Sequence, residues 1–398
     1  MSHSPAGLWE LYIEVFIMKS EKWSRFLSHG FVALISAILT AAVMLGIFVF
    51  HQQGNSKLDV LEKLITDRFI GEVDQTAIED AAAGAMIAAL GDRWSYYIPA
   101  DEFAAYMEQM NNAYVGIGVT VMLGEDGNIQ VVEVVSGGPA EEAGILANDQ
   151  IITVDGQSVI GMDLNDSKTL IQGEENTTVE ITVKRDDGEH TFTVTRRTIA
   201  TPVVESQMLE GNIGFIAIAN FNSNCAKETI AAIESLRSQG AQKLIFDVRN
   251  NPGGYAAELV EVLDYLLPEG KLFTTVDYTG KEHTDMSDAA CLEIPMAVLV
   301  NGNSYSAAEF FAAAMAEYDA AVVIGEKTSG KGYFQTTFRL PDGSAVGLSI
   351  GKYFTPKGVS LEKVGITPDV PVVLENGLIP EDPMQDAQVL AAIEALCS

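Results

Sequence analysis

The chain has few cysteines and few basic residues, and each shortage excludes a class of function. Three cysteines in 398 residues are odd in number and widely separated, so they form neither a disulfide framework nor a CxxC metal or redox site. Only 24 lysines and arginines oppose 55 acidic residues, and the net charge of −31 repels phosphate backbones. The sequence therefore disfavours nucleic-acid binding, and it predicts neither a metal nor another cofactor.

Histidine is also scarce. Five histidines occur, and three of them lie in or next to the N-terminal segment. Only His190 and His283 remain for a catalytic domain. His190 falls in an expected strand and His283 in a polar stretch typical of a surface loop, so a nucleophile that depends on histidine is disfavoured.

One long apolar run, residues 31–50, contains twenty positions without a charge or proline, which is long enough to span a bilayer. Three basic residues precede it: Lys19, Lys22 and Arg25. By the positive-inside rule they keep residues 1–30 in the cytoplasm. The sequence predicts a single-pass anchor in the cell membrane, with residues 51 onward extracytoplasmic. A cleaved signal peptide is the alternative, but it usually has a shorter apolar region and a small-x-small site, which this run lacks.

The spacing of apolar residues divides the rest of the chain into four segments. Helical spacing of apolar residues predicts a helical region over 51–112, and short alternating runs separated by turn signals predict a β-rich module over 113–198. Strands then alternate with helices over 199–380, which is typical of α/β layering with a largely parallel sheet. A C-terminal helix is expected within 381–398.

A candidate nucleophile lies at a strand–turn–helix junction within the α/β region, residues 199–380. The segment 297–309 is expected to be a buried strand, a short turn and a helix start. Ser306 would stand on the turn, where the free N–H groups of the first helical turn can stabilise an oxyanion. The alternative is that Ser304 or Ser306 is only an N-cap.

A serine hydroxyl needs a base, and a lysine can serve if desolvation lowers its pKa. Lys331 follows the next expected strand, and Lys327 is its rival. If the chain is extended from Lys331, the amide of Gln335 shares its face and could orient the ammonium. The segment 325–331 nearly matches a phosphate-binding loop, but Gly332 stands where Ser or Thr should bind Mg²⁺, and a strand is expected after it.

The third element is the turn Asp247–Gly254, where a strand again leads through glycines into a helix. Together, the three segments resemble the carboxy-terminal processing proteases, a Ser/Lys family with a PDZ domain before the catalytic core. The matching patterns are SxSAxE at 304–309, GEKTxGKGxxQ at 325–335 and DxRxNPGG at 247–254. Ala308, where many members have serine, departs from the family.

The resemblance implies a role for each matched position. Ser306 would be the nucleophile, Lys331 the general base and Gln335 its support. An N–H of Gly253 or Gly254 would join that of Ala307 in the oxyanion hole. The implied fold is a ClpP/crotonase-like α/β core with a mixed, largely parallel sheet, an inserted PDZ domain and the transmembrane helix.

The β-rich module carries a second resemblance, to the carboxylate-binding loop of a PDZ domain. This loop comprises Tyr114, Val115, Gly116, Ile117, Gly118 and Val119. Its N–H groups could receive a C-terminal carboxylate. We therefore expect a membrane-anchored serine endopeptidase whose PDZ domain recognises the C-terminal tails of protein or peptide substrates. The alternatives are a catalytically inactive PDZ scaffold of the same family and a P-loop NTPase, and homo-oligomerisation is left open.

Overall fold

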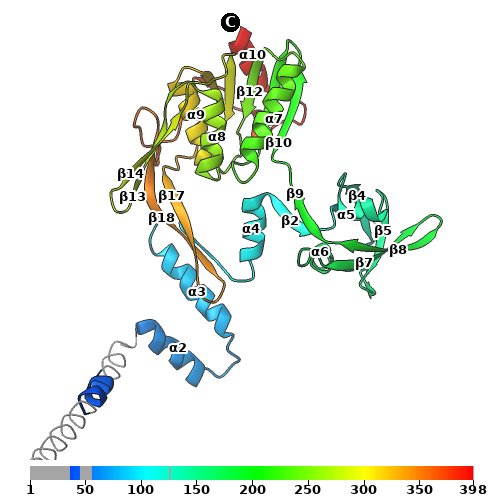
Figure 1. The fold of residues 1–398 in the computed structure, drawn as a ribbon, viewed down its shortest axis with the longest axis vertical. Helices are drawn as coiled ribbons and strands as arrows, with labels where there is room; N and C mark the ends of the chain where they lie inside the picture. Colours follow the sequence, from blue (N-terminus) through cyan, green and yellow to red (C-terminus); the bar gives the residue numbers. More distant parts are fainter. Residues whose placement is uncertain (1–35, 45–55, 125–126, 398) are drawn as a thin grey trace, which may run out of the picture. The chain divides into compact units, whose positions relative to one another are not determined.

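The computed structural model describes residues 36–44, 56–124 and 127–397 (Figure 1). The chain divides into two compact units, residues 1–79 and residues 80–398. Of the expected membrane segment, residues 36–44 are described and are helical, and the rest lies outside the described residues. Within the described ranges, no helix is long and apolar enough to cross a membrane.

The first unit contains α2 (Lys57–Arg68) and the start of α3 (Gln75–Ala88). A capping box begins α2. Ser56 Oγ accepts a hydrogen bond from the Asp59 N–H, and the Asp59 carboxylate accepts one from the Ser56 N–H. These reciprocal bonds satisfy two backbone donors that the first turn leaves free.

The β-rich module belongs to the second unit and forms a six-stranded sheet in the order β3-β4-β5-β7-β8, with β6 paired to β5. Its strands are β3 (Val119–Leu123), β4 (Ile129–Val134), β5 (Gln150–Val154), β6 (Gln157–Ser158), β7 (Thr178–Arg185) and β8 (Gly188–Thr195). The helices α5 (Pro139–Ala143) and α6 (Leu164–Ile171) contribute to the same apolar core. A separate pair, β2 (Ala113–Gly116) and β9 (Arg197–Ala200), brings the two ends of the module together.

The main sheet of the second unit has the order β10-β11-β12-β15-β16-β19. Its strands are β10 (Val204–Leu209), β11 (Ile213–Ile218), β12 (Lys243–Asp247), β15 (Met296–Val300), β16 (Ala321–Gly325) and β19 (Val370–Pro371). Only the β10–β11 pair is antiparallel, and the other pairs are parallel. The expected α/β layering with a largely parallel sheet is confirmed.

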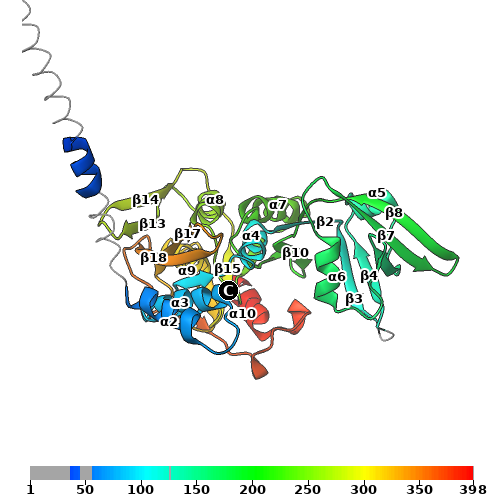
Figure 2. The same ribbon diagram turned by 90° about the horizontal axis from the view of Figure 1, so that it is seen from below.

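Helices cover both faces of this sheet (Figure 2). One face packs on α7 (Cys225–Ser238), α8 (Ala256–Leu266) and α9 (Ala307–Glu317), and the other on α10 (Ala387–Cys397). Alternate residues of one strand therefore enter different cores: Phe246 packs in the first and Ile245 in the second. Burial on both faces explains why these strands are continuous apolar runs.

A second, five-stranded sheet has the order β1-β18-β13-β14, with β17 paired to β18. Its strands are β1 (Tyr96–Ile98), β13 (Gly270–Asp277), β14 (Glu282–Ser287), β17 (Tyr333–Arg339) and β18 (Ala345–Phe354). The β17–β18 pair is a hairpin whose turn contains Pro341–Gly343. The remaining elements are α4 (Phe103–Asn111) and two short 3₁₀ turns, Glu375–Gly377 and Pro383–Gln385.

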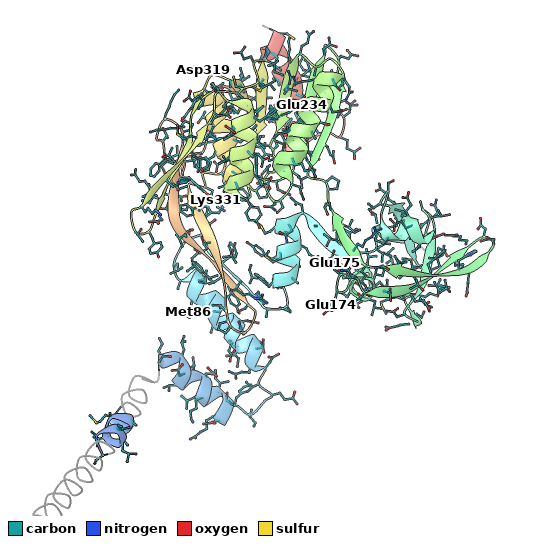
Figure 3. The ribbon with its side chains drawn as sticks, in the orientation of Figure 1. Met86, Glu174, Glu175, Glu234, Asp319 and Lys331 are labelled. Carbon is teal, nitrogen blue, oxygen red and sulfur yellow. The ribbon has the colours of Figure 1, made fainter. Side chains whose placement is uncertain are left out.

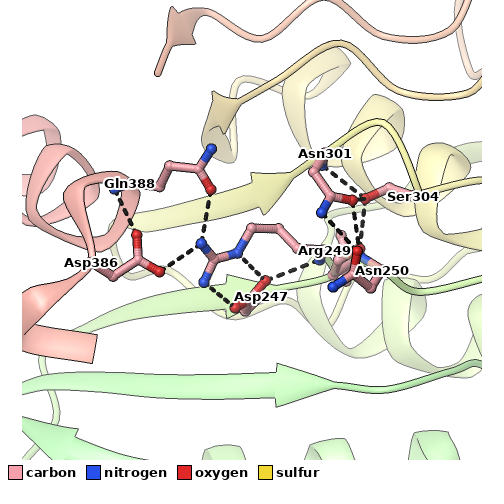
Figure 4. Close-up of polar contacts among 8 residues, drawn as sticks. Asp247, Arg249, Asn250, Asn301, Ser304, Asp386 and Gln388 are labelled. Carbon is pink, nitrogen blue, oxygen red and sulfur yellow. Dashed lines mark hydrogen bonds and ion pairs between the residues drawn. The ribbon is translucent and has the colours of Figure 1, made fainter. Parts of the chain in front are cut away.

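A buried ion network holds the turn after β12 to the C-terminal helix (Figure 4). Arg249 donates to both carboxylate oxygens of Asp247, at 2.8 and 2.6 Å, and to Asp386 at 2.6 Å. It also donates to the side-chain oxygen of Gln388. The Arg249 side chain is 1% exposed, so its charge is compensated by these partners and not by water.

We predict that Arg249→Met destabilises the fold, because it leaves Asp247 and Asp386 buried without their shared cation. Breaking a buried pair in this way costs about 3–5 kcal/mol of unfolding free energy. The measurement is urea denaturation. Arg237→Met is the matched control, since Arg237 pairs with Glu234 at the surface and should change stability by less than about 1 kcal/mol. Equal effects of the two substitutions would contradict the prediction.

Candidate active site

Ser306 stands at the sharp turn between β15 and α9. Its backbone has φ +59° and ψ −124°, a conformation that non-glycine residues rarely adopt and that costs about 1–3 kcal/mol. The neighbouring Ser304 holds the turn, because its hydroxyl donates to the carbonyl of Val248 at 2.7 Å and accepts from the Asn301 N–H. Ser304 is therefore a structural residue. Ser306 also occupies the N-cap position of α9, which agrees with the alternative that it only caps the helix. Its strained turn, however, is typical of a nucleophile.

One buried carboxylate links the backbone of Ser306 to that of Lys331. Glu309 Oε2 accepts from the N–H of Ser306 at 3.1 Å and from the N–H of Lys331 at 2.8 Å. Because both nitrogens bind the same oxygen, they are separated by no more than the sum of these distances. Glu309 Oε1 accepts from the Gly330 N–H and the Thr328 hydroxyl. The structure thus brings the backbones of these two candidate residues together through Glu309, a residue to which the sequence analysis gives no role.

The environment of Glu309 is apolar enough to affect its ionisation. Its side chain lies in the core, and this burial raises its pKa, while the four hydrogen bonds oppose the rise. Four donors on two oxygens match an ionised carboxylate. The sequence signal that could have identified this role is the capping-box spacing, with a glutamate three residues after the N-cap serine.

Two N–H groups beside Ser306 are available to an oxyanion. Ala307 is the first residue of α9, and its N–H has no partner within the helix. Gly253 and Gly254 follow β12, and they differ: the Gly253 N–H donates to Asn251 Oδ1 at 2.8 Å. Among the described residues, no hydrogen bond engages the Gly254 N–H. Gly254 and Ala307 also line the same small cavity as Ser306.

Gly253 instead packs against the Ser306 turn. Its φ is +90°, and a Cβ there would lie 2.7 Å from Ser306 Cβ and 2.9 Å from the Ala307 nitrogen. No side chain fits at this position. Gly254 is equally confined, because a Cβ there would lie 2.2 Å from the carbonyl carbon of Phe221. Close approach therefore requires glycine at both positions, and of their two N–H groups that of Gly254 is the one left without a partner among the described residues.

Lys331, labelled in Figure 3, lies between β16 and β17. Burial is the largest influence on its amine and lowers its pKa to about 8. Asp92, Glu309 and Glu362 oppose this shift, while Arg93 adds to it. The alternative base, Lys327, is exposed. Of these two lysines, Lys331 is therefore the one with the environment of a lysine base.

The amine of Lys331 is not hydrogen-bonded to the Ser306 hydroxyl in this structure. Its Nζ lies over the rings of Trp94 and Tyr305, at 5.0 and 5.7 Å from their centroids. The Gln335 amide nitrogen donates to Ser349 Oγ and to the Tyr333 carbonyl, which leaves its side-chain oxygen as the atom that could accept from the ammonium. The structure brings Ser306 and Lys331 to one site, and among the described residues no hydrogen bond joins their side chains.

The remaining candidates are placed elsewhere. His190 and His283 each contact an aspartate, Asp187 and Asp285, on exposed strand segments. In the parts of the chain that the structure describes, no group of three or more His, Cys, Asp or Glu residues is arranged to hold a metal. The segment 325–331 leads into strand β17, which argues against a phosphate-binding loop.

The expected carboxylate-binding loop, Tyr114–Val119, borders a groove of the β-rich module, but Tyr114–Gly116 lie in β2 and pair with β9. The groove has a volume of about 540 Å³ and is lined by this segment, by β3, by the end of α6 and by α4 residues such as Glu108 and Gln109. Ile117 and Gly118 form the loop between β2 and β3, and Gly118 has φ +78°, a conformation that favours glycine. A groove between a strand and a helix next to such a loop suits an extended peptide.

Comparison with known proteins agrees with this geometry. Residues 212–372 match the model of Peptidase family S41, and residues 130–185 match a PDZ domain. The chain is 36% identical over 366 residues to the carboxy-terminal processing protease CtpA of Bacillus subtilis, covering 88% of this chain and 78% of that protein. The chain belongs to peptidase family S41.

Two further proteins are similar to this chain. A carboxyl-terminal-processing protease of Synechocystis sp. is 31% identical over 316 residues, covering 77% of this chain and 72% of that protein. A solved photosystem II D1 C-terminal processing protease is 30% identical, with a TM-score of 0.47, covering 87% of this chain and 92% of that one. The resemblance found in the sequence is confirmed: this is an S41 serine peptidase with a PDZ domain, and its substrates are proteins or peptides.

In this S41 peptidase, Gly253→Ala should lower kcat/KM about 100-fold or more. The added methyl group must displace Ser306 and Ala307, and a displacement of about 1 Å at a reacting group costs about this factor. The assay is cleavage of a tailed peptide.

The matched control for this substitution is Gly280→Ala. Gly280 has φ +83° and open space around its Cβ position, so it has the same backbone strain without the collision. We expect Gly280→Ala to retain the activity of the unmodified enzyme. A similar loss in both variants would assign the effect of Gly253→Ala to backbone strain.

Proposed function

We propose that the protein is a membrane-anchored endopeptidase that binds C-terminal tails through its PDZ domain and cleaves them with Ser306 as nucleophile and Lys331 as base. The observation that carries this proposal is the shared carboxylate of Glu309, which binds the N–H groups of both residues. The lowered pKa of the buried Lys331 amine supports it, because a general base must be neutral near the working pH.

The chemical steps follow from this arrangement. The neutral Lys331 amine leaves the aromatic rings, accepts the proton of the Ser306 hydroxyl, and the oxygen attacks the scissile carbonyl. The N–H groups of Ala307 and Gly254 stabilise the tetrahedral oxyanion. The protonated Lys331 gives its proton to the leaving amine, and water then hydrolyses the acyl-enzyme by the same route.

The cavity beside Ser306 indicates which side chain precedes the cleaved bond. It is lined by apolar residues and closed by three aromatic rings, those of Phe273, Phe310 and Tyr353. Its volume is about 10 Å³, about the smallest that holds one water molecule. A small apolar side chain is therefore the one that fits.

The location rests on the apolar run at 31–50 and the basic residues before it. We propose that this run anchors the chain in the cell membrane and that the PDZ domain and the peptidase core are extracytoplasmic. Carbonate extraction of membranes, with sequencing of the mature N-terminus, distinguishes an anchor from a cleaved leader.

Ser306→Ala and Lys331→Ala should each abolish cleavage of a tailed substrate, because one removes the nucleophile and the other the base. Mass spectrometry of the products gives the rate and the cleavage sites, and the residue before each cut should be small and apolar. Circular dichroism checks that both variants remain folded. A folded variant that keeps most of its activity would remove that residue from the mechanism.

The PDZ groove should recognise the free carboxylate of the tail. We predict that amidation of the substrate's C-terminus raises KM and leaves kcat nearly unchanged, since the lost contact is remote from the scissile bond. Steady-state kinetics on paired peptides, acid and amide, measure this. An unchanged KM would show that tails are not recognised by their carboxylate.

A further inference from the structure

Trp94 belongs to a tight turn before β1 that is fixed to the peptidase core. Asp92 accepts from the Trp94 N–H and from the Ser95 hydroxyl. Ser95 Oγ in turn accepts from the Ser349 N–H in β18. The next anchor is Arg93, whose guanidinium donates to the carbonyl of Ser329, two residues before Lys331. The residues on either side of Trp94, Arg93 and Ser95, are therefore both anchored to the peptidase core, and this fixes the position of the indole.

The faces of the Trp94 indole contact two cations. Lys331 Nζ lies 5.0 Å from its centroid and the Arg93 guanidinium carbon 4.0 Å. The Trp94 ring also lies 5.6 Å from that of Tyr305, the residue before Ser306. Trp94 thus touches the lysine and the residue next to the nucleophile at once.

The indole N–H takes no part in this arrangement. Trp94 Nε1 is buried and has no hydrogen-bond partner among the described residues. An unpaired buried donor is unfavourable, so hydrogen bonding is no reason for a tryptophan here. The contacts of Trp94 with Lys331, Arg93 and Tyr305 are made by its ring.

Electrostatic influences on the Lys331 amine come from several elements. Asp92 from the Trp94 turn, Glu309 from α9 and Glu362 from the segment after β18 favour the protonated form, and Arg93 disfavours it. Burial outweighs the carboxylates, since the pKa remains lowered to about 8. An aromatic face attracts the cation and by itself favours the protonated form, so the rings lower this pKa only through the water that they exclude.

We propose that Trp94 is the positioning residue of the lysine base: before the reaction its ring holds the amine of Lys331 near the Ser306 turn and shields it from water, until the amine turns to the hydroxyl, with Arg93 on the ring as a second cation. This inference rests on the proposed Ser306/Lys331 mechanism. It adds Trp94 as a support of Lys331, and the role of Gln335 stays a prediction.

The test is the pH dependence of kcat/KM of the full chain on a tailed peptide. Activity should rise with pH as Lys331 loses its proton. Trp94→Leu removes a ring face that attracts the ammonium, which lowers the pKa, and admits water to the amine, which raises it. Because burial is the largest influence on this pKa, we expect the water to dominate, so the pKa rises and this limb moves about one pH unit upward. The value of kcat/KM then falls about tenfold at neutral pH and little on the alkaline plateau. Arg93→Gln should move the limb the same way, because it removes a like charge, and Arg93 is exposed.

Two further variants separate this role from a structural one. Trp94→Phe keeps a ring face and removes the unpaired donor, so it should fold and keep the limb nearly in place. Phe103→Leu is the matched control, since Phe103 lies against Arg339 in a similar contact at 5.1 Å away from Lys331; its limb should not move.

The outcomes are distinguishable. If Trp94→Leu and Arg93→Gln lower the plateau but leave the limb in place, Trp94 is only structural and the inference is overturned. If Lys331→Ala remains active, the proposed mechanism itself fails, whatever the Trp94 variants do. A displaced limb in Trp94→Leu, with Lys331→Ala inactive and Phe103→Leu unchanged, supports the inference.

Discussion

The arrangement of the active site depends on a single buried carboxylate. Glu309 lies in the first turn of α9 and accepts hydrogen bonds from that helix's own N-cap residue and from the loop after β16. A carboxylate without these donors would be costly in the core, so the loop must fold against the helix start. Ser306 and Lys331, twenty-five residues apart in the chain, are brought together by this requirement.

The other half of the site comes from the neighbouring strand. β12 and β15 are parallel and adjacent, so their carboxyl ends meet at one edge of the sheet, where ligands collect in α/β folds. The turn after β12 presents Gly253 to the Ser306 turn and leaves the Gly254 N–H without a partner among the described residues. The Arg249 network, which reaches to the C-terminal helix, maintains the geometry of this turn. The proposed oxyanion donors therefore depend on packing far along the chain.

Local features of this site could be predicted from the sequence, and contacts between distant segments could not. An apolar run followed by a helix start indicates the strand–turn–helix at Ser306. The turn residues Pro341–Gly343 indicate the β17–β18 hairpin. Trp94 is 237 residues before Lys331, so no spacing could place its ring over the amine. The same limit applies to Gln335: its amide nitrogen donates to Ser349 on the paired strand, a partner that its spacing from Lys331 does not indicate.

The lysine environment combines two opposite influences, and the proposed reaction needs both. Before the proton moves, the amine must be neutral, and burial favours that form. After the proton moves, the ammonium must persist long enough to protonate the leaving amine, and the carboxylates Asp92, Glu309 and Glu362 favour that form. Aromatic faces attract the cation without offering it a competing acceptor. A pKa of about 8 is the balance between these influences, and it allows one group to act as base and then as acid.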